Sequence, residues 1–564
     1  MKYLITTLNS KYIHTSLSVR CLYSSVKDAY DVSVCEYTIN DNINYICGDI
    51  YRKKADVICF SCYIWNYSII LTICENLKKA NPGLKIVLGG PEVTYTSEDV
   101  LKANWFVDAV VFGEGEITVS KLFNSMEHNS LPVDVDGVAY RDFGGNVTVN
   151  KPRQPVKNLD DMPFVYDDTI DEYKNKLIYY ETSRGCPFSC SYCLSGENSG
   201  VRFLSMDRVK SDIDFFIKHK VPLVKLVDRT FNANPGRAKE IFRYIIANSR
   251  ETRFHTELAG DLLDDETIQI LSEADENILQ FEIGVQTTNA QTMEAINRRI
   301  KWEPLKSNIL RLLRETKIHI HLDLIAGLPY ENLESFGGSF NDVLDLKPHV
   351  LQLGFLKLLK GSAIRRHEEK FNYRYTSNPP YEVISNDFMS YDDLLLLHNI
   401  DNVFDKYYNS GSFKKTLDFL FARYDNDYFK LFLDIAEYFD KNGLFSVSLS
   451  KYDLYDIMYG YCESMGLDCR NELKYDYIKS IRSHNLPVWC RYEYTKAFTD
   501  CCYAVLKDEE FKKKFLPHYY DIPAKAVFKT VRFEAFSGHM LLFDFKTDAV
   551  IDVTEYFTAN ELEF

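Results

Sequence analysis

The sequence of 564 residues predicts an α/β protein in three parts: a Rossmann-like first domain, a partial (β/α)6 TIM-type barrel and a mostly helical C-terminal domain. Two observations carry this prediction. Short apolar runs alternate with amphipathic stretches over the first two thirds of the chain, and long amphipathic stretches dominate the last third. We expect the first domain at 1–125, a connector at 126–172, the barrel at 173–365 and the helical domain at 366–564.

The composition, with 46% hydrophobic and 26% charged residues, is that of a globular protein. No apolar run reaches the roughly 18 to 20 residues that span a bilayer, and the start lacks a charged leader before an apolar segment. We therefore expect a cytoplasmic protein with no membrane partner. The net charge of −15 also predicts no nucleic-acid partner, unless a local basic patch overrides it. Fourteen cysteines in such a chain favour metal or redox chemistry over disulfides.

The first domain is predicted from apolar runs that alternate with helical patterns. The predicted strands are Tyr3–Leu8, Val32–Tyr37, Val57–Cys62, Lys85–Leu88 and Ala109–Phe112. The helical patterns cover about 15–29, 46–54, 67–80 and 97–104. This alternation predicts a parallel, doubly wound sheet, whose ligands bind beyond the carboxyl ends of the strands.

The loops at those strand ends are candidate binding loops. They carry Asn9, His14, Tyr63, Trp65, Gly89, Gly90, Pro91, Glu92, Gly113, Glu114, Gly115 and Glu116. Glycines let the backbone approach a bulky ligand closely. No GxGxxG string opens the first helix, which disfavours a dinucleotide; another nucleotide, or no ligand at all, is the alternative. The connector that follows carries a predicted small hairpin around Asp136–Asn146 and then an acidic stretch marked by Pro163.

The barrel is predicted from six apolar runs that end in polar residues. They are the strand before Cys186, then Leu223–Val227, Arg253–Leu258, Leu279–Thr287, His319–Ile325 and Val350–Leu358. A barrel enzyme surrounds its substrate with polar residues at the carboxyl ends of successive strands.

Cys186, Cys190 and Cys193 form the stretch around which we expect the chemistry. Three cysteines spaced CxxxCxxC can offer three thiolates to one iron–sulfur cluster, which leaves one iron without a protein ligand. Structural or incidental cysteines are the alternative. Because the stretch follows a predicted strand, its loop is expected where parallel α/β barrels keep their active sites.

This spacing, with Tyr192 before the third cysteine, resembles the signature of the radical S-adenosylmethionine (SAM) enzymes. The Gly-Gly-Pro and Gly-Glu-Gly-Glu loops resemble those of the cobalamin-binding domain that precedes many such barrels. The resemblance implies a [4Fe-4S] cluster that binds SAM and reductively cleaves it to a 5′-deoxyadenosyl radical, and a cobalamin in the first domain. The Asp-x-His-x-x-Gly string of other cobalamin domains is absent, so we expect no histidine below the cobalt and either a polar loop contact or a corrin-edge contact for His14.

The resemblance also assigns SAM contacts. Asp228 and Arg229 fall where the family binds the methionyl amino group, although the usual Gly-Gly-Glu is missing. Glu257 and Gln286 fall where ribose hydroxyls are bound. A barrel-lining ion pair or cap is the alternative for each residue taken singly.

Three further positions follow from the same resemblance. Arg298 is expected to pair with the methionyl carboxylate, which a planar guanidinium fits. Asp323 and Gly327 resemble the fifth-strand turn that contacts adenine.

Amphipathic stretches predict the helices of the last domain, with a hairpin around Ser537-Gly538-His539 after them. The predicted helices are Asp392–Ser410, Phe413–Asn442, Lys451–Gly466, Glu472–His484 and Tyr492–Phe515. A helical C-terminal domain of this kind accompanies a subgroup of the resembling family.

The resemblance favours a cobalamin-dependent methyltransferase that methylates an unactivated carbon through methylcobalamin. The alternatives are a radical rearrangement or cyclisation with cobalamin, a tRNA methylthiotransferase-like enzyme, and a non-catalytic cobalamin- or cluster-binding regulator. The substrate, a small molecule or a peptide, is not readable from the sequence. An electron donor such as flavodoxin or ferredoxin is implied.

Overall fold

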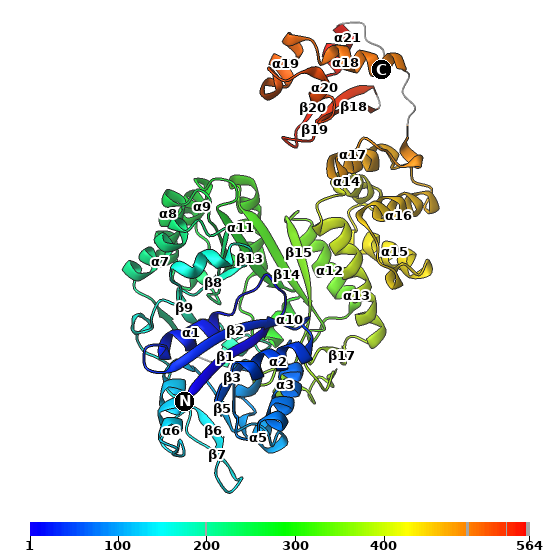
Figure 1. The fold of residues 1–564 in the computed structure, drawn as a ribbon. Coiled ribbons are helices and arrows are strands. Elements are labelled where there is room, and N and C mark those ends of the chain that lie inside the picture. The colour runs from blue at the N-terminus through cyan, green and yellow to red at the C-terminus, as the bar shows by residue number, and fades with distance from the viewer. Residues whose placement is uncertain (198–199, 492–495, 537, 560–564) are drawn as a thin grey trace. The chain divides into compact units, whose positions relative to one another are not determined.

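The computed structural model describes residues 1–197, 200–491, 496–536 and 538–559. It forms two compact units, Met1–Leu394 and Leu395–Phe564, and the division falls within helix α13 (Tyr391–Phe404). The first unit contains two α/β domains, and the second contains a helical region and a small sheet (Figure 1).

A seven-stranded sheet forms the first domain, in the order β2-β1-β3-β4-β5-β6-β7. Its parallel strands are β1 (Lys2–Asn9), β2 (Asp31–Thr38), β3 (Val57–Ser61), β4 (Lys85–Gly89) and β5 (Ala109–Val111). Its helices are α1 (Leu17–Val26), α2 (Ile43–Arg52), α3 (Tyr67–Ala80), α4 (Pro91–Thr94), α5 (Ser97–Ala103) and α6 (Glu116–Glu127). The predicted Rossmann-like domain is confirmed.

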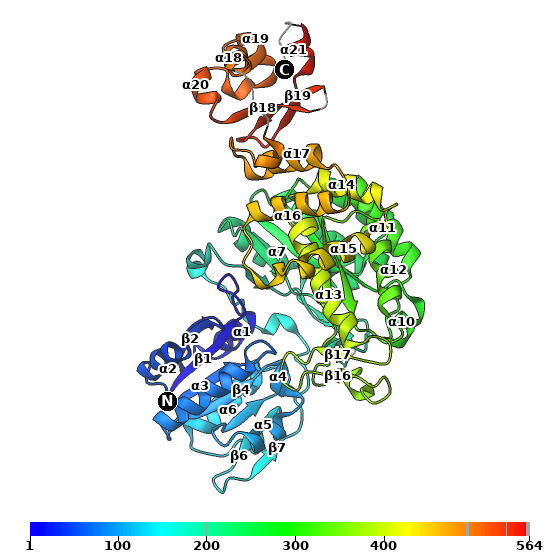
Figure 2. The ribbon, with the colours of Figure 1, turned by 90° about the vertical axis from the view of Figure 1, so that its right-hand side faces the viewer.

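Helices cover both faces of this sheet because successive strand residues point to opposite sides. On β1, Leu4 belongs to the hydrophobic core that includes Ile46 of α2 and Ile73 of α3. Tyr3 belongs to the opposite core, with Val19 of α1 and residues of α6. Figure 2 shows the helices of this domain around its strands. Burial on both faces explains why the strands read as nearly continuous apolar runs.

The predicted small hairpin is β6 (Val138–Arg141) and β7 (Val147–Val149). The hairpin was predicted to lie in the connector, but it extends the first sheet, because β6 pairs antiparallel with β5. This pairing covers the otherwise free edge of β5.

The second domain is an all-parallel sheet of six strands, in the order β15-β14-β13-β12-β11-β8. Its strands are β8 (Ile178–Tyr180), β11 (Leu223–Leu226), β12 (Arg253–Leu258), β13 (Leu279–Gln286), β14 (His319–Ala326) and β15 (Val350–Phe355). Its helices are α7 (Met206–Lys218), α8 (Pro235–Asn248), α9 (Asp265–Ser272), α10 (Ala290–Ala295), α11 (Trp302–Glu315) and α12 (Leu333–Leu344). Buried and half-buried residues alternate along β13, so one face packs under helices and the other faces the barrel interior. The predicted partial barrel is confirmed.

Two short antiparallel pairs accompany the barrel. They are β9 (Ser183–Cys186) with β10 (Gly200–Phe203), and β16 (Arg374–Tyr375) with β17 (Val383–Ser385). The first pair matters for function because β9 leads into the cysteine loop.

The second unit is mainly helical, as predicted, and ends in a three-stranded antiparallel sheet. Its helices are α14 (Lys414–Arg423), α15 (Tyr428–Lys441), α16 (Lys451–Ser464), α17 (Arg470–Ile481), α18 (Lys496–Val505), α19 (Glu509–Phe515), α20 (Ala524–Val527) and α21 (Thr554–Ala559). Its strands are β18 (Val531–Phe536), β19 (His539–Asp544) and β20 (Val550–Asp552).

One helix predicted over Phe413–Asn442 is in fact two, α14 and α15. Asp425 and Asn426 between them have left-handed φ angles of 50° and 61°, which no helix contains, and Asp427 caps α15. The predicted helix over Tyr492–Phe515 also divides, into α18 and α19. Its residues 492–495, and Ser537 of the predicted hairpin turn, lie outside the described residues.

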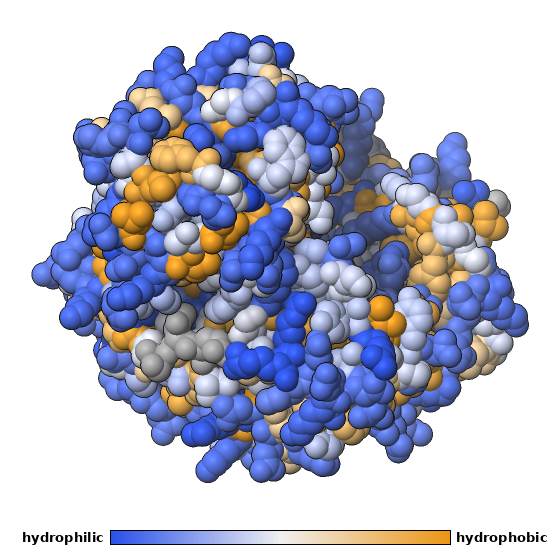
Figure 3. All heavy atoms as spheres, turned by 90° about the horizontal axis from the view of Figure 1, so that it is seen from below, coloured by the Kyte–Doolittle hydropathy of each residue, from blue (hydrophilic) through white to orange (hydrophobic). Residues whose placement is uncertain are grey.

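Over the described residues, none of the helices combines the length and the apolar character that a bilayer-spanning segment needs. The face of the molecule drawn in Figure 3 is mostly hydrophilic, with separate hydrophobic groups.

Candidate functional site

The three predicted cluster cysteines begin at the end of β9 and continue on the loop that follows it. Gly185 precedes the first at a φ of 104°, and a Cβ there would lie 2.2 Å from the carbonyl oxygen of Gly200, so this turn requires glycine. Cys190 is buried, whereas Cys186 and Cys193 are half-buried. All three line a cavity of about 190 Å³, here called the cysteine cavity.

Hydrogen bonds on both sides hold the loop. The Ser191 N–H donates to the carbonyl of Ile296 (2.9 Å), and the Ser191 carbonyl accepts from the N–H of Ile364 (2.8 Å). Asn297 Nδ2 donates to Ser189 Oγ (2.7 Å). A loop fixed in this way keeps its thiols in one geometry.

Polar side chains from neighbouring strands complete the cysteine cavity. Glu257 lies on β12, Glu282 and Gln286 on β13, and Asp323 on β14. A Cβ on Gly284 would lie 2.1 Å from Gln286 Nε2, so the glycine makes room for that side chain. Gln286 has a left-handed φ of 75°, a strain that is typical of functional sites.

Burial sets the charge states of these carboxyl groups. Burial, and then the charges of Glu282 and Glu257, raise the pKa of Asp323, whose buried Oδ1 has no hydrogen-bond partner. Burial, and then Glu282, raise the pKa of Glu257. By contrast, Glu282 accepts hydrogen bonds from His255 Nε2 (3.0 Å) and Lys225 Nζ (3.2 Å), and chiefly the histidine lowers its pKa to about 2. Asp323 therefore retains an oxygen that a ligand can satisfy.

Arg298 joins the cysteine loop to the barrel wall. Its Nη1 donates to the Tyr192 hydroxyl (2.9 Å) and lies 3.7 Å from Cys190 Sγ, and its Nη2 donates to the Gly284 carbonyl. Its Nε is buried without a partner. The guanidinium thus keeps donors for a ligand, the Nε–H among them.

Two predicted contacts do not reach the cysteine cavity. The buried Asp228 carboxylate accepts hydrogen bonds from the Thr182 N–H (3.0 Å), the Thr182 hydroxyl (2.7 Å) and the Ser183 hydroxyl (2.5 Å). It therefore anchors the stretch before Cys186 and is not among the residues that line this cavity. The Gly327 carbonyl accepts from the Tyr373 hydroxyl (3.2 Å) and also lies outside the lining.

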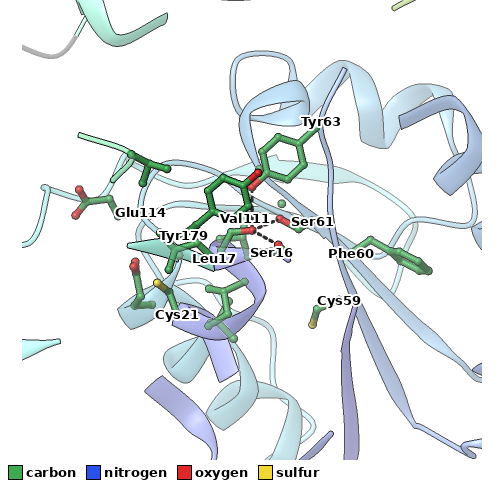
Figure 4. A pocket seen from close by; sticks show the side chains of 18 of the residues that line it. Ser16, Leu17, Cys21, Cys59, Phe60, Ser61, Tyr63, Val111, Glu114 and Tyr179 are labelled. Carbon is green, nitrogen blue, oxygen red and sulfur yellow. Dashed lines mark hydrogen bonds between the residues drawn. The ribbon is translucent and has the colours of Figure 1, made fainter. Parts of the chain in front are cut away.

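A second cavity, of about 650 Å³, lies at the carboxyl ends of the first sheet and is here called the sheet-end cavity. The predicted residues that line it are Asn9, His14, Tyr63, Trp65, Gly89, Gly90, Gly113, Glu114, Gly115 and Glu116. Barrel residues line it as well, and Figure 4 shows Tyr63 of the first domain and Tyr179 of β8 both pointing toward it.

Backbone shapes much of the sheet-end cavity. Gly113 has a φ of 77°, and a Cβ there would meet nothing within 4 Å. Gly90 has a φ of 101°, and a Cβ there would lie 2.5 Å from the Cys62 carbonyl oxygen. The aromatic wall is fixed by the protein itself, since Trp65 Nε1 donates to the Leu8 carbonyl (3.2 Å). The glycine loops thus leave open volume beside the polar side chains of the lining.

His14 takes the polar loop contact that was one of its two expected roles. Its Nδ1 lies 2.5 Å from the Tyr179 hydroxyl, and burial lowers its pKa. Asn9 Nδ2 donates to the His14 carbonyl (3.1 Å). These bonds connect the first domain to β8 at the cavity; a contact to a corrin edge stays a prediction.

Pro91 and Glu92 do not line the sheet-end cavity. Glu92 is 3% exposed, pairs with Lys360 Nζ (2.9 Å) and accepts from the Tyr381 hydroxyl. Its carboxylate therefore joins the loop after β4 to the segment after β15.

The Gly-Glu-Gly-Glu loop meets β9 through ion pairs. Arg184 Nη2 lies 2.5 Å from Glu116 Oε1 and 2.6 Å from Glu181 Oε1. Arg202 pairs with Glu114. Burial lowers the pKa of Arg184, but the charges of Glu181 and Glu116 more than offset this and raise it. Glu181 and Arg184 also line the sheet-end cavity, which was not predicted; their place just before Cys186 was the available signal.

Arg229 lines both cavities. Among the described residues, its guanidinium has neither a hydrogen-bond nor an ion-pair partner. A predicted SAM contact thus lies at the wall shared by the two cavities, with its charge available.

The donor set of the cysteine cavity suits an iron–sulfur cluster with one open iron. Across the described residues, no three His, Cys, Asp or Glu side chains converge tightly enough to hold a single metal ion. Three thiolates that bind different irons of a cluster need not converge on one point. The unpartnered Asp323 Oδ1 and Arg298 Nε fit a polar ligand beside such a cluster.

Three protein families match the chain. The B12 binding domain matches residues 3–123, the radical SAM superfamily matches 180–343, and a protein of unknown function, DUF4080, matches 369–552. The first two matches coincide with the domains that contribute the two cavities.

The chain is similar to the 2-(S-pantetheinyl)-carbapenam-3-carboxylate methyltransferase of Streptantibioticus cattleyicolor, with 28% identity over 329 residues, 53% of this chain and 47% of that protein. It is also similar to the cobalamin-dependent radical SAM methyltransferase TokK of Streptomyces tokunonensis, with 26% identity over 338 residues, 54% of this chain and 47% of that protein. The chain thus spans about half the length of these relatives.

Among solved structures, the fold resembles that of the cobalamin-dependent S-adenosylmethionine radical enzyme OxsB with aqua-cobalamin and S-adenosylmethionine bound. The TM-score is 0.61 at 15% identity, over 86% of this chain and 82% of that one. At this identity the likeness concerns the fold.

Proposed function

Because the chain combines a B12-binding domain with a radical SAM domain and is homologous to cobalamin-dependent radical SAM methyltransferases, we propose that it transfers a methyl group to an unactivated carbon. The observation that carries the proposal is the wall shared at Arg229 by the cysteine cavity and the sheet-end cavity. A substrate held at that wall is close to both cofactors.

The chain's residues take the following parts in this proposal. Cys186, Cys190 and Cys193 hold the [4Fe-4S] cluster, and the glycine loops and Tyr63 hold cobalamin. When bound, SAM and the cluster supply a 5′-deoxyadenosyl radical, and cobalamin supplies the methyl group.

The barrel wall orients SAM in the same proposal. Arg298 binds the methionyl carboxylate, Glu257 and Gln286 bind ribose hydroxyls, and Asp323 accepts a hydrogen bond from adenine. Asp323 can also donate when protonated, a state that its raised pKa favours. Arg229 orients the substrate or the methionyl group at the shared wall.

The partners are proposed on chemical grounds. Radical SAM enzymes generally need a reductant, and a flavodoxin or a ferredoxin fits that need. A reducing compartment such as the cytoplasm suits fourteen free thiols. We propose a small molecule or a peptide as the substrate.

The proposal is tested by anaerobic reconstitution with iron, sulfide and hydroxocobalamin, followed by reduction in the presence of SAM. We expect bound cobalamin, 5′-deoxyadenosine and S-adenosylhomocysteine, with no deoxyadenosine from Cys190→Ala. Deoxyadenosine without S-adenosylhomocysteine, with the corrin retained, would favour a radical rearrangement or cyclisation. An intact cluster and corrin with neither product, even with candidate substrates added, would favour the non-catalytic regulator.

A further inference from the structure

The second unit contains a cavity of its own, lined only by residues of that unit. Its volume is about 550 Å³, within the range of small-molecule sites. Five cationic side chains line it: Lys414, Lys415, Lys451, Lys479 and Arg482. We call it the lysine cavity. It lies within the region that matches the family of unknown function, residues 369–552.

The lysines of this cavity lack acidic partners. Arg482 pairs with Asp548 (2.9 Å), but within the described residues none of the four lysines lies in an ion pair. Asp418, also in the lining, pairs with none of them. Four ammonium groups around one cavity repel each other. The chain has an excess of acidic residues, with a net charge of −15, yet within the described residues none of them forms an ion pair with these lysines.

The buried acid of the cavity is already used. The Asp476 carboxylate accepts hydrogen bonds from the Lys415 N–H (3.1 Å), the Thr416 N–H (2.8 Å) and the Thr416 hydroxyl (2.8 Å). It thereby gives hydrogen-bond partners to backbone N–H groups in the first turn of α14, which have none within the helix. Burial raises its pKa to about 6, so the carboxylate is still mostly ionised near neutral pH, but its oxygens accept from these three donors and not from a lysine side chain.

Local helix electrostatics does not explain the lysines. Lys479 lies in the last turn of α17, where a cation is favourable. Lys414 and Lys415 begin α14, and Lys451 begins α16, and a cation at a helix N-terminus is unfavourable. Three separate helices bring these charges together, so the fold, and not one basic run of sequence, creates the cluster.

We propose that the lysine cavity binds a small molecule through a diphosphate group. Four ammonium groups without an ion-pair partner favour a ligand with several negative charges, and a single carboxylate carries only one. Two of the four have weaker contacts: Lys451 Nζ donates to the Ser480 carbonyl (3.5 Å), and Lys415 Nζ lies 5.8 Å from the centre of the Tyr475 ring. A diphosphate group brings two or more negative charges near neutral pH together with several acceptor oxygens. The cavity volume suits such a group and leaves no room for a nucleic-acid duplex. The site is independent of the proposed methyl transfer, because it uses no residue of the cofactor domains.

The test is isothermal titration calorimetry of the full-length protein at low salt with inorganic pyrophosphate and, separately, with ADP. We expect saturable binding to one site for both ligands. Lys414→Gln/Lys479→Gln should weaken it by about tenfold or more, since charge-assisted bonds are lost. The matched control, Lys513→Gln/Lys525→Gln, neutralises two exposed lysines of the same unit outside the cavity and should change the affinity less than about twofold.

The two ligands separate the sources of the diphosphate. Equal affinities indicate recognition of the diphosphate alone, and tighter binding of ADP indicates that an attached organic group is also bound; either supports the site. No saturable binding of either ligand overturns the proposal, as does an equal effect of the two double variants. Citrate bound as tightly as pyrophosphate would overturn the assignment to phosphoryl groups, and a single-stranded oligonucleotide bound more tightly than ADP would overturn the assignment to a small molecule.

Discussion

The cysteine cavity and the sheet-end cavity belong to one unit, yet they are built in different ways. The cysteine cavity presents thiols, carboxyl groups and guanidinium groups, and two of the buried polar atoms, Asp323 Oδ1 and Arg298 Nε, have no hydrogen-bond partner. The sheet-end cavity is larger, glycine loops form part of its edge, and several of its polar side chains, such as Trp65 and Arg184, already have partners within the protein. One site depends on particular donor atoms, and the other depends on open volume.

The two designs should respond differently to substitution. Neighbouring residues cannot replace a missing donor atom, so its removal should abolish binding of the cofactor that it holds. A change in the shape of a wall should weaken binding by degree, because a large ligand keeps its other contacts. Substitution of residues such as Glu92, which contact the cavity walls but do not line the cavity, should lower stability and leave cofactor affinity unchanged.

The largest effect is expected for Cys190→Ala. Two thiolates cannot hold a cluster that needs three, so the reconstituted variant should lack cluster iron, the cluster absorption and deoxyadenosine formation. Cobalamin retention should equal that of the native chain, because the thiol lies in the other cavity. Iron analysis and visible spectra measure both cofactors on one sample.

The matched control is Cys502→Ala, which removes a buried thiol of the second unit. It should keep the cluster. If Cys190→Ala lost the corrin together with the iron, the two cavities would not be separate sites and the comparison would fail.

The second effect is expected for Gly113→Leu. The backbone there has a φ of 77°, and its missing Cβ faces open space, so a leucine would occupy the volume proposed for the corrin. We expect cobalamin affinity to fall by about tenfold or more, while cluster content stays normal. Equilibrium dialysis with hydroxocobalamin measures the first, and iron analysis measures the second.

Gly145→Leu is the control for this change. Gly145 also has a positive φ, of 87°, with nothing near its absent Cβ, but it lies in the exposed β6–β7 turn. Both variants should lose stability, since a side chain at positive φ costs roughly 1 kcal/mol. Equal losses of cobalamin affinity in both would mean that strain, and not occupied volume, is responsible.

Residues with donor atoms for a cofactor were easier to identify from the sequence than the contacts that hold the cavity walls. The spacing of Cys186, Cys190 and Cys193 directly indicates a cluster-binding loop. Glycine loops that follow apolar strands indicate, by residue type alone, the edge of the sheet where a ligand binds. Asp228 was assigned to a cofactor from the family resemblance, and Glu92 from its place in the Gly-Gly-Pro loop at a strand end. Their partners, Thr182 and Lys360, come from other parts of the chain, and only the folded chain brings them together.

The fold was predictable because, along both α/β domains, the spacing of the apolar residues and the length of each apolar run indicate the same secondary structure. The predicted strand Tyr3–Leu8 is β1 within one residue at each end, for example. The long helix over Phe413–Asn442 was wrong because a polar run without glycine or proline gives little sign of a break. Asp425 and Asn426 tolerate left-handed φ better than most residues, which was the available signal.

The third effect is expected for Asp323→Asn and depends on pH. Burial raises the pKa of this carboxyl in the folded protein, so between the unfolded pKa and the raised folded pKa the native state binds more protons than the unfolded state. The native chain therefore loses stability as pH rises through that window, and asparagine does not. We expect the cofactor-free variant to be more stable than the native chain at pH 7.5 and nearly equal at pH 4.5, by urea denaturation.

The same substitution should weaken SAM binding by roughly threefold to tenfold, because the amide replaces a carboxyl that can accept at both oxygens. A stability gain that is independent of pH would show that packing, not titration, is responsible. Unchanged SAM affinity would remove Asp323 from the proposed contacts.

The smallest effect on the cofactors is expected for Glu92→Gln. The carboxylate is buried against Lys360 and Tyr381, so its loss leaves a largely buried ammonium unpaired and should lower the free energy of unfolding by about 3 kcal/mol. Adding Lys360→Met should recover part of that loss, since the unpaired charge is then gone as well. Because Glu92 lies behind the sheet-end cavity and not in its lining, cobalamin affinity of the folded variant should match that of the native chain. If cobalamin affinity instead fell tenfold and Lys360→Met recovered none of the lost stability, Glu92 would be a direct ligand of the corrin. The sheet-end cavity would then depend on a particular donor atom, as the cysteine cavity does.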